Sequence, residues 1–157
     1  MGKEMRSRQW LSHRLRRFLW SKRVAPLLAE LEYGWLDGGC HTCANALYQW
    51  MLRSRVLEPT ALNLKIIADL RCPAHHVVVR ALYNDRHWYV DANGVSTEEH
   101  LLRYWWQEEH LRDPWLREYD DALLSETGIV CLPRISVRLA EELLTVFGPF
   151  SPIWLHE

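Results

Sequence analysis

The chain has 157 residues, of which 48% are hydrophobic and nine are tryptophan. This length suffices for one domain with a sizeable core, and so many aromatic residues exclude a disordered chain. The formal net charge is only −1, but residues 1–23 hold eight Lys or Arg against one Glu, a local charge of +7 that leaves −8 on the remainder. Positive charge is therefore concentrated near the N-terminus.

The sequence contains no run of about 18 apolar residues, and its N-terminal region lacks the uninterrupted apolar segment of a secretory signal. We therefore expect a cytoplasmic protein. In that compartment the four cysteines, at positions 40, 43, 72 and 131, are expected to be reduced thiols rather than disulfides.

The first predicted element is a basic amphipathic helix within residues 1–23, ahead of a single domain at 24–157. Its apolar positions recur at helical spacing with arginines between them, and they are Trp10, Leu11, Leu15, Phe18 and Leu19. We expect this apolar face to dock on the domain. The charged face is the expected contact for a protein partner, whereas the sequence gives no firm signal for a nucleic acid or a membrane.

A Gly-Gly turn then leads directly into a helix that begins with a cysteine, in the stretch YGWLDGGCHTCANALYQWM from Tyr33 to Met51. Apolar residues at helical spacing after Cys40 predict the helix. Gly38 and Gly39 permit backbone angles and close approaches that other residues resist. The N-terminal end of a helix offers unpaired N–H groups and a partial positive charge, which favour a thiolate. Cys40 is therefore a candidate nucleophile.

Strand-forming residues dominate the middle of the chain. ALNLKIIA at 61–68 predicts one strand, and HHVVVRALY at 75–83 with HWYVD at 87–91 predicts a β-hairpin. Helices are expected at residues 24–32, 96–110, 115–124 and 136–147, and a short edge strand at 129–132. The fold class is thus α+β, with an antiparallel sheet packed on the helix that carries Cys40 and with flanking helices.

A cysteine nucleophile needs a base, and the base needs a group that fixes its tautomer. His76 begins one strand of the predicted hairpin and Asp91 ends the other, 15 residues later. With the turn at 84–85, position 76 lies opposite about 91 to 93, so the hairpin brings the two side chains together. Cys40, His76 and Asp91 are therefore the candidate catalytic nucleophile, base and orienting group, and His75 remains an alternative base.

This order of Cys, His and Asp resembles the transglutaminase-like branch of the papain-like cysteine enzymes, which includes arylamine N-acetyltransferases and bacterial cysteine peptidases and amidases. The resemblance rests on GGCHTCANAL at Gly38–Leu47, HVVVR at His76–Arg80 and WYVDANG at Trp88–Gly94. It implies a papain-like core and a thioester intermediate on Cys40. The implied enzyme is a thiol protease, amidase or deamidase, or a transglutaminase or acyltransferase, that acts on a peptide or amide substrate without a cofactor or metal.

An acyl-transfer site also needs hydrogen-bond donors for the developing oxyanion. The backbone N–H of Cys40 is one candidate, and the preceding loop offers Tyr33, Trp35 and Gly39 as oxyanion or substrate contacts. Cys43, one helical turn after Cys40, is expected to be a buried core residue.

Two other functions fit the same residues. Residues 40–43 form a Cys-x-x-Cys that would bind zinc if Cys72 and one of the histidines at 75 and 76 completed the site, or would serve in redox chemistry. Alternatively, the chain is a non-catalytic interaction or scaffold protein, in which Cys40, His76 and Asp91 have structural roles. The agreement of three independent features, the glycines before Cys40, the strand histidine and the matching aspartate, favours the enzyme.

Overall fold

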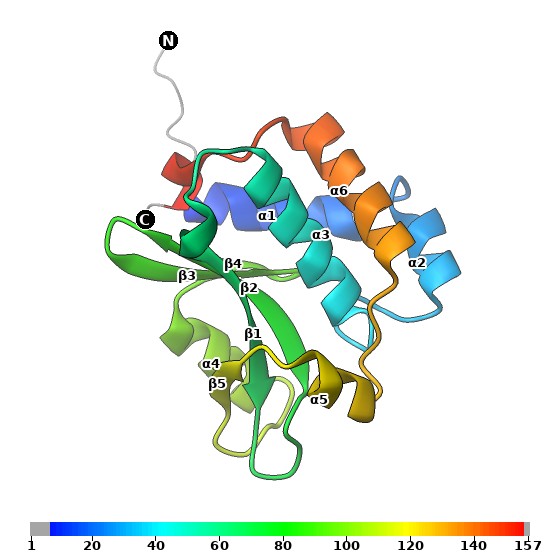
Figure 1. Ribbon diagram of the computed structural model, residues 1–157, viewed down its shortest axis with the longest axis vertical. Coiled ribbons are helices and arrows are strands. Elements are labelled where there is room, and N and C mark those ends of the chain that lie inside the picture. Colours follow the sequence, from blue (N-terminus) through cyan, green and yellow to red (C-terminus); the bar gives the residue numbers. More distant parts are fainter. Residues whose placement is uncertain (1–6, 156–157) are drawn as a thin grey trace.

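The computed structural model describes residues 7–155, in which helices come first, then four strands of a sheet, and then further helices with the fifth strand among them (Figure 1). The helices are α1 (Arg8–Leu19), α2 (Ala25–Leu31), α3 (Cys40–Arg53), α4 (Glu98–Gln107), α5 (Asp121–Glu126) and α6 (Pro133–Phe147), with 3-10 helices η1 (Pro59–Ala61) and η2 (Pro152–Leu155). The strands are β1 (Leu62–Ala68), β2 (His76–Tyr83), β3 (Arg86–Asp91), β4 (Gly94–Ser96) and β5 (Trp115–Glu118). The predicted α+β class is confirmed. Between residues 7 and 155, no helix is long and apolar enough to cross a membrane.

The five strands form one antiparallel sheet in the order β4-β3-β2-β1-β5. Strands β2 and β3 make the predicted hairpin, and the turn residues Asn84 and Asp85 have φ values of 52° and 58°. A two-residue hairpin turn requires such left-handed angles, and Asn and Asp tolerate them better than most residues. The turn therefore fixes a register that extends to Val79 opposite Val90.

Helices cover both faces of this sheet (Figure 1). Helix α3 lies on one face and shares the main core with Val77 and Val79 of β2, while α6 packs against α3. The other face carries a smaller cluster under α4, which consists of Ile67, Val78, Tyr89, Leu101, Trp105 and Leu111. Because side chains alternate along a strand, His76 belongs with Val78 on the α4 face.

Helix α1 docks on the rest of the protein by its apolar face, as predicted. Its buried hydrophobic residues are Leu11, Leu15, Phe18 and Leu19. The Oγ atom of Ser12 accepts a hydrogen bond of 2.8 Å from the backbone N–H of Val95 on the edge strand β4. Gly94 permits this contact, because a Cβ atom there would lie 2.5 Å from the Cβ of Ser12. Residues 1–6 of the segment 1–23 in which this helix was predicted lie outside the described residues.

Three sequence-based expectations were wrong at the C-terminal side of the sheet. Residues 115–118 form strand β5 rather than a helix, because they pair with the otherwise open edge of β1. Residues 129–132, which were expected to be an edge strand, contain no strand. Helix α4 starts at Glu98, two residues later than expected, because Ser96 pairs with β3 as part of β4 and the Oγ atom of Thr97 caps the helix.

Candidate active site

Cys40 is the first residue of α3, and the glycine turn before it determines where that helix begins. The backbone N–H of Gly39 donates to the carbonyl oxygen of Gly34 at 3.0 Å. A Cβ atom on Gly39 would lie 2.6 Å from that oxygen, so the tight turn requires glycine. Gly38 adopts a φ of 89°, which other residues rarely adopt. The sequence thus places the Cys40 side chain at the start of the helix through a turn that only small residues can make.

The hairpin brings His76 and Asp91 together on the α4 face of the sheet. The pairing of β2 with β3 ends at Val79 opposite Val90, and His76 and Asp91 lie just beyond this last pair. Because side chains alternate along a strand, His76 shares the face of Val78 and Asp91 that of Tyr89, which is the α4 face in both cases. The Nε2 atom of His76 is 2.9 Å from Oδ2 of Asp91, and Oδ1 of Asp91 accepts a 2.9 Å bond from the backbone N–H of Asn93. The carboxylate is therefore fixed by the turn that follows β3 and orients the imidazole.

Cys40 and Asp91 together determine the protonation of His76. Burial lowers the pKa of His76, but hydrogen bonding and charge from Asp91 and Cys40 outweigh burial and raise the pKa to about 9. Among residues 7–155, the Nδ1 atom of His76 has no partner at ordinary hydrogen-bond geometry. The Cys40 thiol is therefore a close neighbour of His76 but does not form a regular hydrogen bond with it. Such contacts are often loose without substrate and shorten in the reactive complex. An imidazolium beside a thiol is the environment that activates cysteine nucleophiles.

Trp105 of α4 covers the imidazole, a contact that the sequence analysis missed. Its ring centroid lies 4.3 Å from that of His76 with an interplanar angle of 30°. The indole Nε1 atom is buried and has no hydrogen-bond partner in the described part of the chain. The helical spacing of Leu101 and Trp105 indicates burial, but it carries no information about the partner across the sheet. Trp105 shields the His76–Asp91 pair from water.

The three side chains lie in a closed site. Cys40 and His76 are each 1% exposed, and Asp91 is 4% exposed. Leu36, on the loop before Cys40, packs against both hydrophobic clusters and so spans the two faces near the site. A substrate would reach Cys40 only after a movement of this loop or of Trp105.

The loop residues proposed as oxyanion or substrate contacts have other roles. The indole N–H of Trp35 donates to the carbonyl oxygen of Leu19 at 2.8 Å, and the N–H of Gly39 is used within the turn. Neither donor is therefore free for a substrate, which corrects these two expectations. Tyr33 is 56% exposed, with its ring beside Gly38. The N–H of Cys40 remains a candidate donor, because the first N–H groups of a helix lack an intrahelical acceptor.

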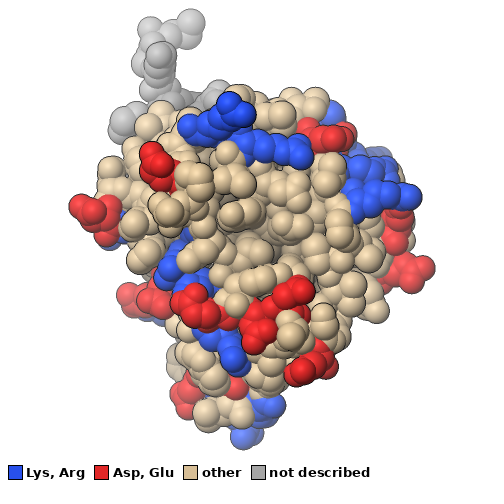
Figure 2. All heavy atoms as spheres, in the orientation of Figure 1, with Lys and Arg blue, Asp and Glu red and all other residues tan. Residues whose placement is uncertain are grey.

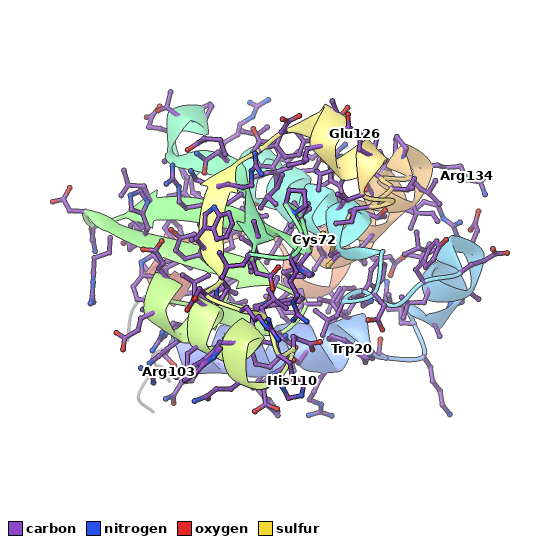
Figure 3. All side chains as sticks on the ribbon, turned by 90° about the horizontal axis from the view of Figure 1, so that it is seen from below. Trp20, Cys72, Arg103, His110, Glu126 and Arg134 are labelled. Carbon is purple, nitrogen blue, oxygen red and sulfur yellow. The ribbon has the colours of Figure 1, made fainter. Side chains whose placement is uncertain are left out.

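The adjacent histidine belongs to a different pair. The Nε2 atom of His75 lies 2.8 Å from Oδ1 of Asp69, in the loop between β1 and β2. Burial raises the pKa of Asp69, but hydrogen bonds from the backbone N–H of Arg112, from His75 and from the backbone of Arg71 and Cys72 lower the pKa well below its usual value. Figure 3 views this end of the fold, with Cys72 near its centre. Asp69 thus holds the loop together, and His76 rather than His75 faces Asp91.

The Cys-x-x-Cys does not assemble a metal site in this arrangement. Cys43 is a core residue, as expected, and burial raises its pKa well above the usual value, with further contributions from the charges of Asp91 and Cys40. The thiol of Cys72 instead donates to the carbonyl oxygen of Ala74 at 3.2 Å. Over residues 7–155, no group of three or more His, Cys, Asp or Glu is placed to hold a metal ion, and all four cysteines are free.

No protein-family model, curated protein or solved structure matches this chain. Any functional assignment therefore rests on the geometry of Cys40, His76 and Asp91 and on the chemistry that these groups support.

Proposed function

We propose that this protein is a cysteine-dependent acyl-transfer enzyme with a Cys40–His76–Asp91 triad, of the transglutaminase-like, papain-like kind. One observation carries the proposal. The carboxylate of Asp91 lies 2.9 Å from Nε2 of His76 and engages that atom. The Nδ1 atom of His76 has no hydrogen-bond partner in the described residues, and the imidazole lies beside Cys40, the cysteine that begins α3. An orienting carboxylate, a base and a nucleophile are thus arranged in the order that acyl transfer requires.

In the proposed mechanism the Cys40 thiolate attacks an amide or ester carbonyl carbon, and the electron pair of the carbonyl moves to its oxygen. The N–H of Cys40 at the start of α3 stabilises that oxyanion. The oxyanion collapses to a thioester as the bond to the leaving group breaks, and the His76 imidazolium supplies the proton that the leaving amine or alcohol needs. Neutral His76 then takes a proton from water or an amine, which attacks the thioester and releases Cys40. Asp91 keeps the imidazole oriented throughout.

The identity of the second nucleophile separates the possible activities. Water gives a peptidase, amidase or deamidase, and an amine gives a transglutaminase or another acyltransferase. A second candidate function, a non-catalytic binding module, is favoured by the closure of the site, since both Cys40 and His76 are 1% exposed. The binding module predicts that Cys40 is inert and that Cys40→Ala leaves partner binding unchanged.

Competitive alkylation of the four cysteines distinguishes these candidates. Cys72 and Cys131 are more exposed than Cys40, so access alone predicts that they react first. An activated Cys40 should instead be the first thiol labelled by limiting iodoacetamide, as read by mass spectrometry of peptides, and His76→Ala should abolish that preference. Cys43→Ala is the matched control and should leave it intact. Labelling of Cys72 and Cys131 ahead of Cys40 would support the binding module.

A further inference from the structure

The indole of Trp105 lies against the imidazole of His76, and the proposed mechanism gives this contact no role. The two ring centroids are 4.3 Å apart and the ring planes differ by 30°, so the rings are stacked nearly parallel rather than edge to face. Trp105 is 3% exposed and belongs to the cluster under α4 together with Leu101 and Val78. The packing of α4 on the sheet therefore fixes the indole over one face of the imidazole.

The imidazole that Trp105 covers is charged in a place that is closed to bulk water. His76 is 1% exposed, and its pKa of about 9 makes it an imidazolium at neutral pH. The ionisable groups that act on this imidazolium are Asp91 at the end of β3 and Cys40 at the start of α3. Asp91 approaches the edge of the imidazole, at Nε2, whereas Trp105 covers a face.

The other ionisable groups of the elements around His76 point away from it or are neutral. The acidic and basic side chains of α4 are exposed, namely Glu98, Glu99, His100 and Arg103. The phenol of Tyr104, on the same helix, stays neutral at pH 7 because burial raises its pKa. The surface over α3 is mainly uncharged as well (Figure 2). One face of a buried cation thus rests on an uncharged aromatic ring.

This arrangement meets the conditions for a cation–π interaction. The face of an aromatic ring carries partial negative charge and attracts a cation that lies within about 6 Å of the ring centre. Indole attracts cations most strongly among the aromatic side chains, and the attraction increases where water is excluded. The imidazolium of His76 lies within this distance of the indole and is buried. An aliphatic side chain at position 105 would cover His76 but would not attract its charge.

We propose that Trp105 is a positioning residue, whose indole face stabilises the charged form of His76 and holds the imidazole against Asp91. The use of that charge, to keep a thiolate at Cys40, rests on the proposed function, but the stabilisation itself does not depend on catalysis. This role differs from the exclusion of water, and the two roles predict opposite effects. A smaller side chain that admits water would favour the imidazolium, whereas loss of the indole face disfavours it.

NMR titration of the His76 ring in Trp105→Leu distinguishes these two roles. The midpoint should fall from about 9 in the wild-type protein by about one pH unit, because the attraction of the indole is lost. Trp105→Phe keeps an aromatic face that attracts a cation more weakly, so its midpoint should lie between the two. A Trp105→Leu midpoint equal to or above the wild-type value would overturn the proposal.

The matched control is Trp88→Leu. Trp88 is also 3% exposed, and its indole N–H likewise has no hydrogen-bond partner in the described residues, but it lies in the main core on the opposite face of the sheet. Trp88→Leu should leave the His76 midpoint near 9, although it also removes a buried indole. A fall as large as that in Trp105→Leu would show that general loss of packing lowers the midpoint, and would overturn the proposal.

Fluorinated tryptophan tests the same role without a substitution that could unfold the protein. Fluorine withdraws negative charge from the face of the indole and hardly changes its shape. Protein grown with 5-fluorotryptophan should show a smaller but measurable fall of the His76 midpoint, and the same replacement in Trp105→Phe should cause none. An unchanged midpoint in the fluorinated wild-type protein would overturn the proposal. These titrations measure the charge of His76, so they decide the role of Trp105 whether or not the alkylation experiment finds Cys40 reactive.

Discussion

Asp91→Asn is the substitution that most directly tests how the site controls its histidine. Asn keeps the shape of the side chain but removes the charge that lies 2.9 Å from Nε2 of His76. The difference between the usual pKa of 6.5 and the raised value of about 9 corresponds to roughly 3 kcal/mol of preference for the imidazolium, shared between Asp91 and Cys40. Burial alone acts in the opposite direction. Without the carboxylate, the pKa of His76 should therefore fall well below 9, towards or below 6.5.

The assay is an NMR titration of the His76 ring between about pH 5 and pH 10. Wild-type His76 should titrate near 9, and the Asp91→Asn variant should titrate at least one pH unit lower. His75→Gln is the control and should leave the His76 midpoint near 9, because His75 is paired with Asp69 instead. A wild-type midpoint at or below 6.5, or one that Asp91→Asn does not move, would refute the reasoning.

The same pair predicts a pH dependence of stability. The folded pKa of His76 lies above its unfolded value, so the contribution to the free energy of unfolding is fully present below about pH 6.5 and is lost as the pH rises through about 9. Urea unfolding should show a decline of up to about 3 kcal/mol over this window in wild type and a flatter profile in Asp91→Asn. A wild-type profile that is as flat as that of Asp91→Asn between pH 6.5 and 9 would contradict this linkage.

Two further predictions concern the turn before α3 and the loop beneath the sheet. Gly39→Ala should lower the free energy of unfolding by about 2 kcal/mol, because its Cβ would lie 2.6 Å from a backbone oxygen, whereas Gly34→Ala, with its nearest contact at 3.5 Å, should be almost neutral in thermal unfolding. Equal effects would contradict the turn geometry. The pKa of Asp69 is lower in the folded protein than its usual value of 3.8, so the ionised carboxylate stabilises the fold at pH values above 3.8. This contribution is lost as the pH falls below 3.8 and through the lower pKa of the folded state. Asp69→Asn should therefore flatten the acid limb of urea unfolding and cost about 3 kcal/mol at neutral pH, and an unchanged acid limb would oppose this role.

The local elements near the site were predictable because their signals are local. The glycines and apolar spacing predicted the helix that begins at Cys40, and Asn84-Asp85 between strand-forming residues predicted the hairpin and its register. That register puts His76 and Asp91 on one face of the sheet within two positions of each other, which is close enough for their side chains to meet.

The remaining features depend on contacts between segments far apart in the sequence. The composition of residues 115–118 predicts a helix, but they form strand β5 because they pair with the open edge of β1. The donor of Trp35 is taken by Leu19, and Trp105 meets His76 across the sheet. Neither contact has a signal in the local pattern. The hydrogen bond between His41 and the hydroxyl of Tyr119 likewise joins residues that lie 78 positions apart in the chain.

The measurement that tests the central claim most directly is the pH dependence of Cys40 alkylation by limiting iodoacetamide in wild type and His76→Ala. An unactivated thiol reacts appreciably only near its ordinary pKa of about 8.5. We predict that wild-type Cys40 labels rapidly well below about pH 8, ahead of the other three cysteines, and that His76→Ala removes this reactivity without unfolding the protein. A Cys40 that stays inert, or that labels no faster than the other cysteines at any pH, would contradict the proposal that it is a nucleophile activated by His76.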